Sequence, residues 1–116
     1  MTLLELYKFM LEAGIPVWHY EAQEEDKPYI VYQEVATSDD YASGQPIRER
    51  VKVEIVHFTD REFDPSLEWL KEALRWLKIP FTVAHGFDPE SKNIISQFDV
   101  TIYKDLEDDH ERKQID

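Results

Sequence analysis

Two stretches of strict apolar–polar alternation constrain the fold of this chain more than any other feature. Residues 29–35 (YIVYQEV) and 48–58 (RERVKVEIVHF) each place β-branched or aromatic side chains at every second position. Successive side chains of a strand point to opposite faces of a sheet, so both stretches predict strands. In the second stretch Val51, Val53, Ile55 and His57 share one face, while Lys52, Glu54, Val56 and Phe58 share the other. This pattern favours a half-buried antiparallel pair.

Eleven polar or small residues, Ala36 to Pro46, separate the two predicted strands and include Asp39, Asp40 and Tyr41. We predict a long polar loop here. A loop of this length without structure of its own is usually functional or disordered in a compact domain.

Two helices are predicted on either side of this pair. Thr2 and Glu5 form a capping box, and Gly14 followed by Pro16 ends the helix that begins there. Its predicted apolar face consists of Leu3, Leu6, Tyr7, Met10 and Leu11. Asp64 and Pro65 provide the cap and first residue of the second helix. That helix carries a core stripe of Leu67, Leu70, Leu74 and Leu77.

The second helix also carries a second apolar stripe, made of Trp69, Ala73 and Trp76. A helix that lies on one face of a small sheet needs only one apolar stripe. Two interpretations stay open: the tryptophans pack against the margin of the sheet, or they form a subunit interface, where Trp is enriched.

The remaining elements complete the predicted fold. Residues 17–20, 81–84 and 97–103 are further strand candidates, and residues 86–89 supply a turn signal between the last two. We therefore predict an α+β fold with a mixed or antiparallel sheet of four to five strands and two main helices packed on one face. Residues 1–104 form the single domain, and residues 105–116 an acidic, disordered tail.

Charge and composition exclude several classes of function. The net charge of −12 rules out a basic groove for nucleic-acid phosphates and disfavours an anionic membrane surface. The chain has no cysteine, no apolar run near the roughly 20 residues of a membrane helix and no signal-peptide pattern. We expect a protein that is cytosolic when made. The acidity itself fits plain solubility, a surface that mimics DNA, or a wall past which DNA slides.

No constellation for catalysis or metal binding stands out. The four histidines are scattered, no two of them at the spacing of a helical metal site, and the three glycines lie far apart. His57 with Asp60 and Asp64, and the pair Asp39 and Asp40, are proximities that an acidic chain shows by chance. We predict that the protein is not an enzyme and has no catalytic residue, no cofactor and no metal.

Three segments carry a resemblance to a known family: residues 28–35 (PYIVYQEV), 48–60 (RERVKVEIVHFTD) and 79–103 (IPFTVAHGFDPESKNIISQFDVTIY). Together with the N-terminal amphipathic helix and the isolated Tyr41, they resemble the small tail-completion proteins of long-tailed phages and Gram-positive prophages. These are the tail terminator or head–tail joining proteins. The resemblance covers nearly the whole chain as an order of elements, and the acidic stretch after Lys104 has no counterpart in it.

This resemblance implies a structural virion protein that assembles into a homo-oligomeric, hexameric ring on the end of the tail tube. Its partners would be the tail tube protein and the head-completion protein, with DNA only passing through the channel and no membrane involved. It would lie in the host cytoplasm during assembly and then in the virion tail. The interface residues we expect are Trp69, Ala73 and Trp76, and in the loop Asp39, Asp40 and Tyr41. The alternative is an acidic DNA-mimic inhibitor of the anti-restriction type.

Overall fold

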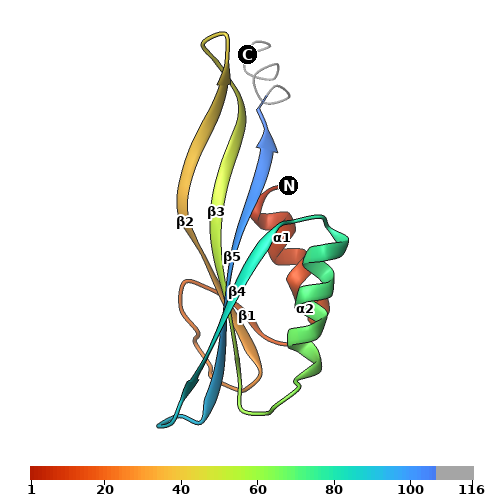
Figure 1. The fold of residues 1–116 in the computed structure, drawn as a ribbon, viewed down its shortest axis with the longest axis vertical. Coiled ribbons are helices and arrows are strands. Elements are labelled where there is room, and N and C mark those ends of the chain that lie inside the picture. The colour runs from red at the N-terminus through yellow and green to blue at the C-terminus, as the bar shows by residue number, and fades with distance from the viewer. Residues whose placement is uncertain (107–116) are drawn as a thin grey trace.

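The fold is one mixed sheet with both helices on the same face, seen in a computed structural model that describes residues 1–106 (Figure 1). The strands are β1 (Val17–His19), β2 (Tyr29–Ala42), β3 (Gln45–Thr59), β4 (Phe81–Asp88) and β5 (Asn93–Asp105). They lie in the order β1-β2-β3-β5-β4, with β1 parallel to β2 and all other neighbours antiparallel. The predicted α+β class is confirmed, and of the alternatives that the sequence left open the sheet is mixed and has five strands.

Both helices begin as their sequences predict. The helix α1 (Leu3–Met10) has the Thr2–Glu5 capping box, and a short 3₁₀ helix (Leu11–Ala13) ends at Gly14 in the left-handed conformation, with φ 76°. The helix α2 (Pro65–Trp76) is capped by Asp64, which accepts a hydrogen bond from Ser66 N. One expectation for α1 is wrong: Leu11 is 43% exposed, because the chain tightens into the 3₁₀ turn there and leaves the buried face.

The core lies between the two helices and the central strands. Leu6 and Met10 of α1 and Leu70 and Leu74 of α2 pack against the facing side chains of β2, β3 and β5, which include Ile30, Tyr32, Val53, Ile55, Phe98 and Val100. Each such buried side chain contributes about 1.5–3 kcal/mol relative to exposure. The register places Ile30 opposite His57 and Tyr32 opposite Ile55, so the predicted alternation is confirmed.

The predicted loop over residues 36–46 is wrong. These residues continue β2 and β3 into a long hairpin that extends past the helices (Figure 1). Only Ser43 and Gly44 form the turn, between the paired residues Ala42 and Gln45, and both have positive φ, 52° and 75°. Positive φ at both central residues is the geometry of a type I′ hairpin turn, whose twist matches that of the flanking strands. Irregular pairing after Glu34 lets β2 reach this register.

Two boundaries near the C-terminus also differ from the sequence prediction. Gly86 and Phe87 belong to β4, and the turn comes later, at residues 89–92. It starts there because Asp88 accepts hydrogen bonds from Glu90 N and Ser91 Oγ, at 3.0 and 2.8 Å. The strand β5 runs to Asp105, and Leu106 N bonds Ile47 O, so the ordered part extends beyond residue 104. The rest of the predicted acidic tail, residues 107–116, lies outside the described residues.

None of the helices within residues 1–106 has the length and apolar character needed to cross a membrane.

Candidate interaction surfaces

The second apolar stripe of α2 forms a groove with the end of α1. The ring of Phe9 stacks on Trp69 and on Trp76, with ring centroids 5.8 and 6.0 Å apart. The hollow between them has a volume of about 380 Å³, and we call it the aromatic groove; its lining consists of Phe9, Glu12, Trp69, Glu72, Ala73 and Trp76. A surface made of three stacked aromatic rings on a helix pair that already has its core elsewhere is typical of a contact site.

The three residues of the predicted stripe differ in their surroundings. Ala73 is buried and Trp69 packs against the core, whereas Trp76 leaves 74% of its surface exposed. The contact across the groove comes from Phe9 of α1, which sequence reasoning missed. The sequence does hold one indication of this contact, because Phe9 is an apolar residue that lies outside the predicted apolar face of α1.

The charges at the aromatic groove are unevenly neutralised. Glu72 pairs with Arg75, and Glu68 pairs with Lys71 at 3.2 Å, so the carboxylates of α2 have partners on the same helix. The Arg75 guanidinium also lies 5.7 Å from the ring centroid of Phe81. Glu12 has no hydrogen bond or ion pair in the part of the chain that the structure describes. The groove is therefore apolar inside with one unpaired carboxylate at its edge.

The other predicted interface residues lie near the tip of the β2–β3 hairpin. Asp40 accepts from Arg48 Nε and Nη2 at 2.8 and 2.6 Å and from Arg50 Nη2 at 2.7 Å. The hydrogen bonds from Arg48, with the nearby charge of Arg50, hold the pKa of Asp40 below its usual range. The Arg48 guanidinium stacks on Tyr103, 4.3 Å from the ring centroid.

Asp39 and Tyr41 flank this cluster. Asp39 lies opposite Glu49, on the other face of the hairpin from Asp40, and Tyr41 is 64% exposed. The hairpin tip reaches past the end of the helical layer (Figure 1). The six predicted interface residues therefore fall on two separate surfaces, one on the helices and one on the hairpin.

A third exposed feature, which the sequence did not single out, is the turn between β3 and α2. Phe63 is 94% exposed and adopts a φ of 55°, a left-handed conformation that is rare for a bulky residue. The backbone around it is anchored, because Thr59 Oγ1 donates to Asp64 Oδ2 at 2.6 Å and accepts from Arg61 N at 3.3 Å. An apolar ring is thus presented to solvent from a well-held turn.

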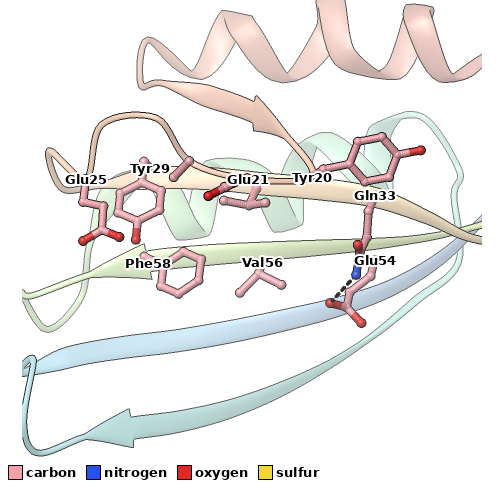
Figure 2. Close-up of a pocket in the computed structure, with 10 residues that line it drawn as sticks. Tyr20, Glu21, Glu25, Tyr29, Gln33, Glu54, Val56 and Phe58 are labelled. Atoms are coloured by element: carbon pink, nitrogen blue, oxygen red, sulfur yellow. Dashed lines mark hydrogen bonds between the residues drawn. The ribbon is translucent and has the colours of Figure 1, made fainter.

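The sheet face opposite the helices holds a pocket beneath the β1–β2 connection (Figure 2). Its volume is about 430 Å³, and its lining is aromatic, aliphatic and acidic: Tyr20, Glu21, Ala22, Glu25, Tyr29, Val31, Gln33, Glu54, Val56 and Phe58. Tyr29 and Phe58 stack with centroids 4.7 Å apart, and Glu54 accepts from the amides of Gln33 and Gln97 at 3.5 and 3.3 Å. This lining contains no nucleophile paired with a base.

Beneath the start of α2 lies a buried polar cluster. His57 Nε2 is 2.7 Å from Ser66 Oγ, which lies 2.6 Å from Asp64 Oδ1. Because the Ser66 hydroxyl donates to Asp64, it accepts from His57, so neutral His57 carries its proton on Nε2. Burial lowers the pKa of His57, and the charge of Asp64 offsets only part of this.

Residues 1–106 contain no group of three His, Cys, Asp or Glu placed to hold a metal ion.

A comparison of the chain with known protein families finds no matching family. A comparison with curated proteins finds no match either.

Proposed function

We propose that the protein is a structural, non-enzymatic component that caps the tail tube of a long-tailed phage or prophage as a homo-oligomeric ring and joins it to the head connector. The observation that carries the proposal is the aromatic groove. Trp76 stays 74% exposed although the domain already has a core between the helices and the sheet. Exposed aromatic surface of this kind marks sites at which a protein binds a partner, which supports a role as a subunit.

The charge of the chain supports the same proposal. At −12 it repels DNA phosphates, so DNA passes through a channel lined by these subunits without binding. A DNA mimic would need unpaired carboxylates arrayed along a helix face. On α2, Glu68 and Glu72 are paired with Lys71 and Arg75, which interrupts such an array.

The partners of the ring would be the tail tube protein and the head-completion protein, with six subunits expected from the resemblance. The hairpin tip with Asp39, Asp40 and Tyr41 is the contact element we propose for these partners. Arg48 and Arg50 form ion pairs with Asp40, so the conformation of the hairpin tip is fixed before a partner binds. A preformed element loses less conformational entropy on binding than a disordered loop does.

The test is the molar mass by light scattering across a concentration series, followed by negative-stain imaging of the peak. We expect a species near six subunits with ring-shaped particles, produced without DNA. A protein that stays strictly monomeric at every concentration, and that competes with DNA for a nuclease, would instead be a DNA mimic.

A further inference from the structure

The turn between β3 and α2 presents the most exposed large apolar side chain of the described residues. Phe63 is 94% exposed, and the neighbouring Arg61 has an exposed side chain that forms no ion pair within residues 1–106. Anchoring by Thr59 and Asp64 fixes the backbone on both sides of this pair. The turn therefore offers one aromatic ring and one positive charge in a fixed arrangement, which we call the Phe63 knob.

The aromatic groove has the opposite features. It is a hollow of about 380 Å³, at the small end of the range that proteins use to hold ligand-sized groups, which starts near 300 Å³. Its walls are the rings of Phe9, Trp69 and Trp76, and an aromatic side chain stacks favourably against such rings. At its edge Glu12 is an unpaired carboxylate, which an incoming arginine can neutralise.

We propose that the Phe63 knob of one copy inserts into the aromatic groove of a second copy, with Arg61 pairing with Glu12. This inference rests on the proposed function, since it names the interface that joins the subunits. A second copy is the occupant that the two surfaces favour, because apolar surface meets apolar surface and the unpaired carboxylate of Glu12 meets the Arg61 guanidinium.

The positions of the two halves determine the kind of assembly. The knob precedes Pro65, the first residue of α2, whereas the groove is built from Trp69 to Trp76 and the end of α1. The two halves are different patches, and a heterologous contact between them leaves each joined pair of subunits with one free knob and one free groove. Such contacts propagate head to tail and end only when the ring closes. The α2 helices then follow one another around the ring.

The experiment uses two variants of the full chain that each disable one half, Phe63→Ser and Trp76→Glu. We expect each variant alone to be monomeric by light scattering, with an association constant reduced by about tenfold or more, as for a central interface aromatic. An equimolar mixture should form heterodimers and stop there, because Phe63→Ser keeps an intact groove and Trp76→Glu keeps an intact knob. Phe87→Ser, which removes another exposed aromatic from β4, is the matched control and should assemble like the wild type.

The charge pair is tested in the same way. Arg61→Glu should weaken assembly, and adding Glu12→Arg should restore it. Because the chain has no cysteine, Arg61→Cys mixed with Glu12→Cys should form a disulfide-linked heterodimer faster than either variant links with itself. Circular dichroism and thermal melting should show that every variant remains folded, because the substituted positions are exposed.

The outcomes separate this inference from the proposed function. If the wild type forms rings and Phe63→Ser forms them equally well, the knob-and-groove contact is wrong and the proposed ring is supported. If knob and groove join the chains into filaments or open oligomers, the inference stands and the ring cap is contradicted. A wild type that stays monomeric contradicts both, and a mixture of the two variants that stays monomeric contradicts the knob.

Discussion

At the scale of single residues, the buried cluster beneath α2 links folding to charge. Asp64 is 3% exposed and accepts from Ser66 N and Oγ and from Thr59 Oγ1. Burial alone would raise the pKa of Asp64, but these hydrogen bonds outweigh it and the pKa lies below its ordinary value. The carboxylate is therefore a cap that stays ionised in a nearly dry site.

Replacing this cap should destabilise the fold. We expect Asp64→Ala to lower the free energy of unfolding by about 1–2 kcal/mol, since it removes the N-cap and leaves Ser66 and Thr59 with unpaired donors. Urea denaturation measures the change. Asp60→Ala, at an exposed position of the same turn, is the control and should stay within about 0.5 kcal/mol of the wild type.

His57 should make stability depend on pH. Its pKa in the folded protein is below the ordinary 6.5, so the unfolded chain binds the proton more tightly. Stability from the neutral ring is complete above about pH 6.5 and falls as the pH drops towards the folded pKa. We expect His57→Gln to flatten the slope of the unfolding free energy against pH below about pH 6.5. A slope unchanged in His57→Gln would contradict the assignment.

At the scale of elements, the β2–β3 hairpin shows where sequence reasoning failed. Residues 36–42 lack apolar alternation because neither face of this part of the hairpin packs in the core. Hydrophobic periodicity therefore could not indicate a strand there. The signals that could have located it are local: Ser43-Gly44 as a hairpin turn dipeptide, and Asp40 placed to meet Arg48 across the turn. By contrast, the strands at residues 29–35 and 48–58 were predicted from their alternation, and in the second the predicted apolar face with Val51, Val53 and Ile55 is the buried one.

The turn itself can be tested with a single methyl group. Gly44 has φ 75° with open space around its Cα, so Gly44→Ala is disfavoured by backbone conformation alone, by about 1–2 kcal/mol. We expect faster amide hydrogen exchange in the hairpin tip, measured by NMR. Gly86→Ala is the matched control, because Gly86 has open space but no positive φ, and its exchange should not increase.

At the scale of the whole molecule, the candidate site was predictable only in part. The helical spacing of Trp69, Ala73 and Trp76 identified one wall of the groove. The sequence could not show that Phe9 forms the other wall, because the crossing of α1 and α2 is set by tertiary packing. The sequence could not predict the exposure of Phe63 either. That exposure depends on the turn held by the hydrogen bonds of Thr59 and Asp64, and such a turn leaves no hydrophobic periodicity in the sequence.

The difference in burial between the two tryptophans gives a further prediction. Trp69 packs against the core, so Trp69→Glu should destabilise the monomer by about 3 kcal/mol or more, the cost of removing a packed aromatic ring. Trp76→Glu should leave the unfolding free energy within about 0.5 kcal/mol of the monomeric wild type while it abolishes assembly. Denaturation at low protein concentration measures both, and unfolding of Trp76→Glu would place the second stripe in the core.

The strand order also has a consequence for how the chain folds. The central strand β3 finds its first neighbour, β2, across a two-residue turn, but its second, β5, only after α2 and β4 have been made. Closing that longer loop costs entropy before any contact repays it, so we expect the β2–β3 arm to form early and β5 to dock late. Until then one edge of β3, rich in valine and isoleucine, is unpaired. A newly made chain is therefore most prone to aggregate during this interval, while that edge is open to pair with another chain.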